Sequence, residues 1–214
     1  MTNSQQHLEA LADIRRIMDR SSRFLSLSGL SGVGAGIIAL TGTFIAQYIL
    51  NDYYVDYEAV GFRGTDFMEL RFKLTVLGVI VFVFALVAGY YFTWRKTRKQ
   101  QVSLWESSTR RLMMSLIVPL AAGAVFIFGM LRYNEWRFVS PACLIFYGLA
   151  LLNASKYTLD EIRYLAYCEI VLGLVNVWMP GKGLYFWGLG FGILHIIYGL
   201  VMWRKYDSGE QKSS

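Results

Sequence analysis

Two ionisable residues, Glu169 and His195, lie deep inside long apolar stretches in the C-terminal third of the chain. A turn at Pro180 and Gly181 separates the stretches, and the two residues stand at nearly equal distances along the chain from Gly181. Because an α-helix rises about 1.5 Å per residue, two antiparallel helices would place both side chains within roughly 3 Å of the same depth. The spacing therefore predicts that a carboxylate and an imidazole face each other in a helical hairpin.

Small residues accompany both ionisable groups at helical spacing. They share the predicted contact face and are Ala166, Gly173, Gly188, Gly192 and Gly199. Small side chains let two helices approach closely, which brings polar groups between them into contact. Asn176 shares the face of Glu169, nearer the outer end of the helix. We therefore predict a binding or proton-relay site formed by Glu169, His195 and Asn176.

A carboxylate and an imidazole held away from water can share a proton, because histidine titrates near physiological pH. This chemistry suits a small transporter, a channel or a pH-responsive sensor. A metal centre is a second hypothesis, since the thiols lie at similar depth and such ligands suit zinc or copper. Its ligands would be Cys143, Cys168, Glu169 and His195. The simplest alternative is a structural hydrogen bond between helices, worth about 0.6–2 kcal/mol.

Several motifs that identify membrane enzymes are missing from the sequence. It contains neither the H-E-x-x-H of zinc proteases nor a phosphate-binding Walker A sequence. No lysine lies in the middle of an apolar stretch, which argues against a retinal Schiff base. One intramembrane histidine cannot supply both axial ligands of a haem. We therefore predict no cofactor and favour a protein that is not an enzyme.

The elements that must hold these groups are apolar helices. The chain of 214 residues is 55% hydrophobic and 17% charged, whereas soluble domains are about 25% charged. Crossing a membrane as a helix takes about 20 mostly apolar residues. Six blocks approach this pattern, at residues 24–50, 72–94, 112–131, 138–152, 159–179 and 184–203. We predict an all-α polytopic membrane protein with six transmembrane helices.

Positive charge orients such a bundle, because basic residues near the ends of spans stay in the cytoplasm. In a six-span arrangement most of the 21 Lys and Arg residues fall on the side that both termini share. The opposite side receives only Arg63, Arg71, Lys73, Arg132, Arg137 and Lys182. We therefore predict cytoplasmic N- and C-termini, a transmembrane bundle over residues 24–204 and a cytoplasmic tail over residues 205–214.

Residues 1–23 are predicted to form a cytoplasmic amphipathic helix. Its apolar stripe consists of Leu8, Leu11, Ile14 and Met18. Such a helix lies on the membrane surface or docks a cytoplasmic protein partner. Together with the basic loop 95–111, it supports the alternative function, a membrane scaffold or regulatory protein that acts through cytoplasmic partners.

The first apolar block carries a second packing surface. Ser28, Gly32 and Gly36 are spaced four residues apart, which is the small-xxx-small pattern of closely packed membrane helices. Packing within the chain is the default use of this face, and a homodimer through it is the alternative. The lipid bilayer is the remaining partner. The short basic runs belong to no nucleic-acid recognition fold, so we predict no nucleic acid.

Three stretches carry a resemblance to known proteins. They are Ser26-Leu-Ser-Gly-Leu-Ser-Gly32, residues 147–163 and Leu194-His-Ile-Ile-Tyr-Gly199. In these strings the chain resembles a family of uncharacterised bacterial six-span membrane proteins. The resemblance implies a multi-pass protein of the bacterial inner (plasma) membrane, and it transfers no site residues.

Overall fold

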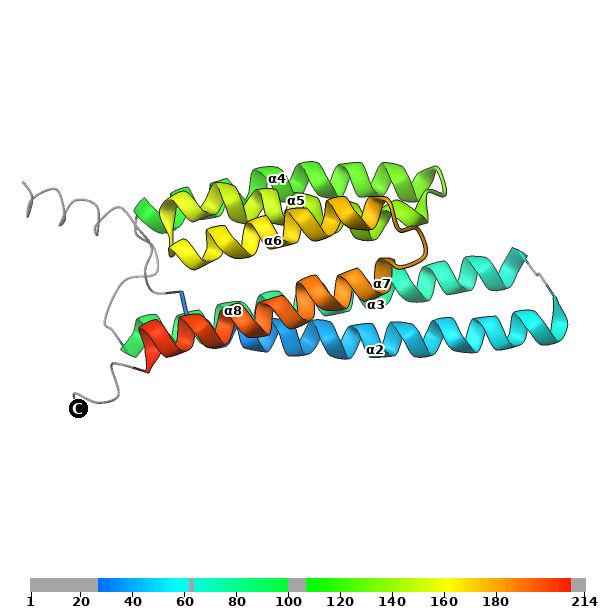
Figure 1. The fold of residues 1–214 in the computed structure, drawn as a ribbon, viewed down its shortest axis with the longest axis horizontal. Coiled ribbons are helices and arrows are strands. Elements are labelled where there is room, and N and C mark those ends of the chain that lie inside the picture. Colours follow the sequence, from blue (N-terminus) through cyan, green and yellow to red (C-terminus); the bar gives the residue numbers. More distant parts are fainter. Residues whose placement is uncertain (1–26, 62–63, 100–106, 209–214) are drawn as a thin grey trace, which may run out of the picture.

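The structure, a computed structural model, describes residues 27–61, 64–99 and 107–208 (Figure 1). Over these ranges the protein is all-helical, and none of the described residues forms a strand. The all-α prediction is therefore confirmed for this part of the chain. The predicted amphipathic helix 1–23 lies outside the described residues, and so does much of the basic loop, at 100–106.

Six helical rods follow one another along the described chain. The first five are α2 (Gly29–Val60), α3 (Gly64–Lys99), α4 (Ser107–Arg132), α5 (Val139–Ala154) and α6 (Asp160–Val177). The sixth, called the C-terminal helix below, joins α7 (Gly183–Trp187), η3 (Gly188–Leu194), α8 (His195–Met202) and η4 (Trp203–Asp207). Two short 3-10 turns, η1 (Trp136–Phe138) and η2 (Ser155–Tyr157), flank α5.

Five of these rods are long and apolar enough to cross a membrane. The fourth apolar block is longer than its sequence suggested, because the turns on both sides of α5 extend it to Trp136–Tyr157. α6 is not among the five, since its 18 residues carry several charges. These are Asp160, Glu161, Arg163 and Glu169. Five of the six predicted spans therefore have the length and composition needed to cross a membrane.

The rods form two three-helix units (Figure 1). In the first unit α2 packs between α3 and the C-terminal helix, and in the second unit α5 packs between α4 and α6. The two units meet mainly where α5 and α6 touch the C-terminal helix. The fold therefore brings the predicted partners, α6 and the C-terminal helix, together at the boundary between the units.

Small residues explain the close packing in the first unit. A methyl group on Gly32 would lie 3.1 Å from Cα of Gly199, and one on Gly36 would lie 2.7 Å from a backbone oxygen of the C-terminal helix. The hydroxyl of Ser28 donates a hydrogen bond of 3.2 Å to Asp207. The face predicted for a homodimer is thus covered by the chain's own C-terminal helix.

In the second unit, small residues likewise allow α5 and α6 to pack closely. A methyl group on Gly148 would lie 2.9 Å from the Ala166 carbonyl oxygen, and one on Gly173 would lie 3.0 Å from the Ile145 nitrogen. Leu144 is fully buried beside them. α6 is consequently held tightly against α5, and its polar residues Glu161, Glu169 and Asn176 are buried.

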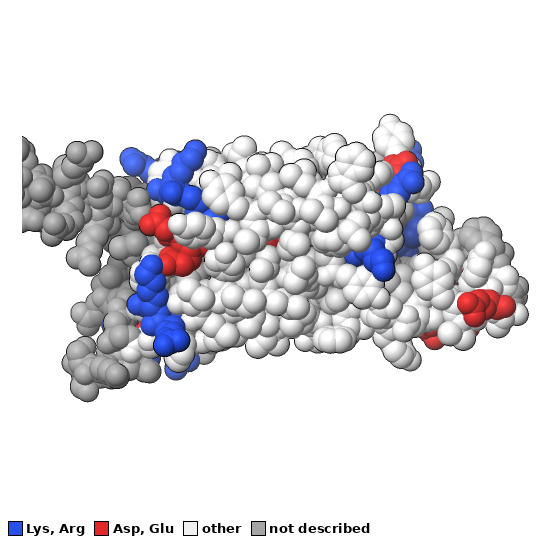
Figure 2. Space-filling view, viewed as in Figure 1, with Lys and Arg blue, Asp and Glu red and all other residues white. Residues whose placement is uncertain are grey.

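Charged side chains gather at the two ends of the molecule, with an apolar surface between them (Figure 2). Large apolar side chains are exposed along the middle of α3, among them Phe82, Phe84 and Val87. Soluble monomers rarely expose a wide continuous apolar surface. Together with the five long apolar helices, this surface suggests a membrane-spanning protein.

The α2–α3 hairpin extends beyond the other helices at one end of the molecule (Figure 1). α2 has 32 residues and α3 has 36, compared with 26 in α4. The end with this extension is called the hairpin end below, and the end where residues 27 and 208 lie is called the terminal end. At the terminal end the C-terminal helix continues through Asp207, past the boundary at residue 204 that the sequence predicted.

Candidate functional site

Glu169 of α6 and His195 of α8 meet at the boundary between the two units. Nδ1 of His195 lies 3.5 Å from Oε1 of Glu169, so the predicted facing of these residues is confirmed. The Glu169 side chain is 0% exposed and the His195 side chain 8% exposed. A carboxyl group and an imidazole thus share one site, sealed from the surroundings by the packed helices.

A local widening of the C-terminal helix positions the histidine. The segment η3 is a π-helix that contains three buried glycines, Gly188, Gly190 and Gly192. Its wide turn leaves the Gly190 carbonyl oxygen 3.0 Å from Nδ1 of His195. A carbonyl oxygen only accepts hydrogen bonds, so Nδ1 carries the proton in this arrangement. π-helical turns occur frequently at functional sites.

Tyr147 of α5 completes the surroundings of the imidazole. Its hydroxyl lies 2.7 Å from Nε2 of His195. In the neutral ring Nε2 is an acceptor, so Tyr147 donates, and in the imidazolium the direction reverses. The same hydrogen bond therefore accommodates both protonation states of His195.

Tyr147 was not among the predicted site residues. Its one sequence signal is a hydroxyl inside an apolar block, and tyrosines are common near the ends of membrane helices for other reasons. The ring of Tyr147 also contacts that of Phe191, which packs against Trp187, with ring centroids 5.2 Å and 4.6 Å apart. These aromatic rings form one wall of the site.

Three buried acceptor oxygens of the predicted site residues have no hydrogen-bond donor within the described part of the chain. They are Oε1 and Oε2 of Glu169 and Oδ1 of Asn176. Asn176 is 2% exposed and lies on α6 toward the hairpin end, where its Oδ1 is 4.0 Å from the position of a Cβ on Gly183. The structure therefore places the three predicted residues in the interior of the bundle and gives two of them unsatisfied oxygens.

The predicted metal ligands do not come together. No group of three or more His, Cys, Asp or Glu side chains that could hold a metal occurs within the described ranges. Cys143 and Cys168 are both free thiols, and Sγ of Cys168 lies 3.6 Å from the hydroxyl of Tyr198. The set Cys143, Cys168, Glu169 and His195 is therefore not a metal centre in this structure.

A serine motif also falls at the start of α2. Residues 29–32 read Gly-Leu-Ser-Gly, the G-x-S-G pattern of intramembrane serine proteases. The hydroxyl of Ser31 donates to the carbonyl oxygen of Ser28 at 2.5 Å. The His195 ring is engaged by Tyr147 and Gly190. The structure therefore does not pair this serine with the histidine as a nucleophile and base.

Polar contacts connect the two units at the terminal end. Lys205 donates to Oε1 of Glu161 at 2.5 Å, and the Tyr206 hydroxyl donates to both oxygens of the same carboxylate at 3.0 and 3.1 Å. Glu161 belongs to α6, whereas its two donors belong to η4. This cluster therefore ties the second unit to the C-terminal helix.

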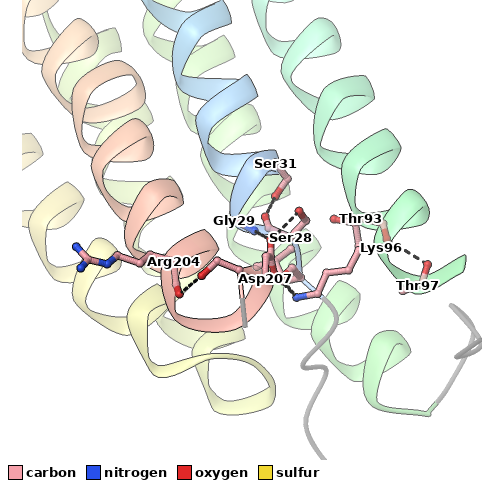
Figure 3. A network of polar contacts seen from close by, with 10 residues as sticks. Ser28, Gly29, Ser31, Thr93, Lys96, Thr97, Arg204 and Asp207 are labelled. Carbon is pink, nitrogen blue, oxygen red and sulfur yellow. Dashed lines mark hydrogen bonds and ion pairs between the residues drawn. The ribbon is translucent and has the colours of Figure 1, made fainter. Parts of the chain in front are cut away.

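A second network at the terminal end holds the first unit together (Figure 3). Oδ1 of Asp207 lies 2.7 Å from Nζ of Lys96 on α3, and both side chains are nearly buried. Oδ2 accepts from the Gly29 amide at 3.0 Å, in the first turn of α2. Asp207 thus supplies from a distant part of the chain the N-terminal cap that α2 needs.

Arg71 of α3 bridges the units at the hairpin end. Its guanidinium donates to Oδ1 of Asn134 at 2.5 Å and to the Leu131 carbonyl oxygen at 3.2 Å. It also stacks on the Trp136 ring, 4.6 Å from the ring centroid. The site at Glu169 thus lies between two polar bridges, one at each end of the unit boundary.

Comparison with protein-family models, curated proteins and solved structures finds no match to this chain. The class of the protein therefore follows from its fold: an all-helical bundle whose five long apolar helices suggest a membrane-spanning protein. The chain holds a buried carboxyl–imidazole pair at the boundary of two helical units.

Proposed function

We propose that this chain is a proton-responsive protein of the bacterial inner membrane, a small transporter or pH sensor, in which Glu169 and His195 change protonation state. The observation that carries the proposal is the sealed contact of 3.5 Å between these side chains at the boundary of the two units. Ionisable groups inside a bilayer are costly, so they are functional candidates by default. Because the site is sealed, a gated change between two arrangements is favoured over a permanently open channel.

A change of protonation alters the forces across the unit boundary. Glu169 comes from the second unit and His195 from the first, and an ion pair attracts strongly in a medium of low dielectric constant. Protonation of the carboxylate or deprotonation of the imidazolium removes that attraction. The bridges at Glu161 and Arg71 then limit how far the units separate at either end. A protonation-dependent attraction between two units that stay connected is what a transporter or sensor needs to alternate between two states.

The proposal includes six membrane crossings with both termini in the cytoplasm. Of the six proposed crossings, α6 has the weakest apolar character because it carries charged residues. Four charged residues reduce its apolar character, but Glu161 and Glu169 are buried by neighbouring helices rather than exposed to lipid. The terminal end carries most of the basic residues, as the cytoplasmic side of a membrane protein does.

Cysteine labelling tests whether α6 crosses the membrane. In a chain with Cys143 and Cys168 replaced by alanine, we expect Lys182→Cys to react with an impermeant maleimide on intact cells, and Lys156→Cys to react only after the cells are opened. Both positions are exposed, and they flank α6. Labelling of both cysteines from the same side would rule out the six-span topology.

Tryptophan fluorescence of the purified full chain tests the proton response. Trp187 packs against Phe191, which stacks on His195, so fluorescence reports on the site. We expect a sigmoidal change between about pH 5 and 8, lost in Glu169→Gln and in His195→Gln. The exposed residue Glu58 gives a control, because Glu58→Gln leaves the change intact. A pH response that persists in both site variants contradicts the proposal.

The scaffold alternative rests on segments that largely lie outside the described residues, 1–26 and 100–106. It stays a prediction from the sequence. Deletion of residues 1–23 tests it directly, since a scaffold loses its cytoplasmic partners while the helical bundle stays intact.

A further inference from the structure

We propose that Tyr147 is a positioning residue of the proton-responsive site: its hydroxyl fixes the orientation of the His195 ring and stabilises the charged form of that ring more than the neutral form. This inference rests on the proposed function. It adds a residue of α5 to the pair that α6 and the C-terminal helix contribute. The proton response then depends on how the second unit holds Tyr147 against His195.

The first argument is the orientation of the imidazole. Nδ1 of His195 lies 3.0 Å from the Gly190 carbonyl oxygen and 3.5 Å from Oε1 of Glu169. Nε2 lies 2.7 Å from the Tyr147 hydroxyl. A half-turn of the ring would put a carbon in the place of each nitrogen and break both hydrogen bonds. The Tyr147 hydroxyl therefore helps to keep Nδ1 on the side of the carboxyl group.

The second argument is the reversal of this hydrogen bond when the ring gains a proton. The hydroxyl donates to Nε2 of the neutral ring, and it accepts from Nε2 of the imidazolium. Phenylalanine can do neither. A hydrogen bond from a charged donor is about twice as strong as one between neutral groups. Tyr147 therefore stabilises the imidazolium more than the neutral ring.

The third argument is the small number of ionisable side chains that touch the ring. α2 presents Gly32 and Leu40 to this part of the C-terminal helix, and neither is ionisable. α6 contributes Glu169 and α5 contributes Tyr147. Within the described part of the chain, these two are the ionisable side chains in contact with the His195 ring. A change at Tyr147 therefore acts on the charge of His195 with few competing effects.

The ring of Tyr147 is held in place independently of its hydroxyl. It packs on the rings of Phe191 and His195, with centroids 5.2 Å and 5.4 Å apart. The next residue, Gly148, lies where α5 and α6 are closest, since a methyl group on it would lie 2.9 Å from the Ala166 carbonyl oxygen. Phenylalanine at position 147 keeps these packing contacts and removes only the hydroxyl.

The test is a pH titration of the Trp fluorescence of the purified full chain, with Tyr147→Phe beside the wild type. We expect the midpoint of the response to fall by about half to one pH unit, because the variant loses more hydrogen-bond energy in the imidazolium than in the neutral ring. Thermal unfolding of the same samples measures any purely structural loss.

Tyr198→Phe is the matched control. Tyr198 is partly buried, as Tyr147 is, but its hydroxyl contacts Sγ of Cys168. We expect this variant to keep the wild-type midpoint. A midpoint in Tyr147→Phe that is unchanged or higher overturns the assignment, whatever its thermal stability. Equal shifts in the two variants overturn it as well.

The same titrations separate this inference from the proposed function. A wild-type response that Tyr147→Phe leaves unchanged overturns the role of Tyr147, and the proton response of Glu169 and His195 stands. Absence of a response in the wild type overturns both proposals.

Discussion

Alanine at Gly199 should push the C-terminal helix away from α2 and lower the stability of the bundle. A methyl group there would lie 2.6 Å from the Val33 nitrogen and 2.8 Å from the Gly29 carbonyl oxygen. These are backbone atoms, so a side-chain rotation cannot relieve the clash. Overpacking of a close helix contact costs about 1–3 kcal/mol, and we expect at least that loss in thermal unfolding followed by circular dichroism.

The chain contains matched controls for this substitution. Gly78 and Gly89 lie on α3 with no atom within 4 Å of a Cβ placed on either. Alanine at these positions should be neutral or stabilising by up to about 1 kcal/mol, because it removes the conformational freedom of a helical glycine. If Gly199→Ala behaves like Gly78→Ala, the helices are not as close as the structure indicates.

Methionine at Lys96 should destabilise the terminal end by about 3–5 kcal/mol, the usual cost of removing one partner of a buried ion pair. The side chains of Lys96 and Asp207 are 10% and 12% exposed, so water cannot replace the lost ammonium group. The lost group also donates to the Leu27 carbonyl oxygen at 3.1 Å. Unfolding in a denaturing detergent titration measures the change.

Two further variants serve as controls for Lys96→Met. Lys73→Met breaks the exposed pair Lys73–Glu69 and should cost less than about 1 kcal/mol. Asp207→Asn, combined with Lys96→Met, leaves a neutral amide that needs no cation, so most of the stability should return. The interpretation fails if Lys96→Met and Lys73→Met have equal effects.

The pairing of Glu169 with His195 was predictable because it depends on distances within one helical hairpin. Equal spacing from the turn at Gly181 sets their depth. The small residues did not set their faces as predicted, because Gly173 packs against Ile145 of α5, and Gly192 and Gly199 pack against α2. Tyr147 was not predictable in this way. It comes from α5, and its place beside the imidazole depends on how the second unit docks against the first, which no local pattern encodes.

The same reasoning explains the other differences. The π-helical turn at Gly188–Leu194 contains three glycines. Glycine allows many backbone conformations, so these residues did not predict this one. Asp207 was placed in a cytoplasmic tail. Its role as the cap of α2 was not predictable, because no neighbouring residue in the sequence indicates it. Contacts between residues far apart in the chain were the part of the fold that periodicity could not reveal.

The extended α2–α3 hairpin has a consequence for local stability. At about 1.5 Å per residue, the 32 residues of α2 span roughly 48 Å, whereas the hydrocarbon core is about 30 Å thick. The excess length stands beyond the other four helices, and Tyr53 and Phe67 there make a ring contact between α2 and α3. We therefore expect the amides of the extension to exchange hydrogen by local opening while the bundle beneath it stays folded.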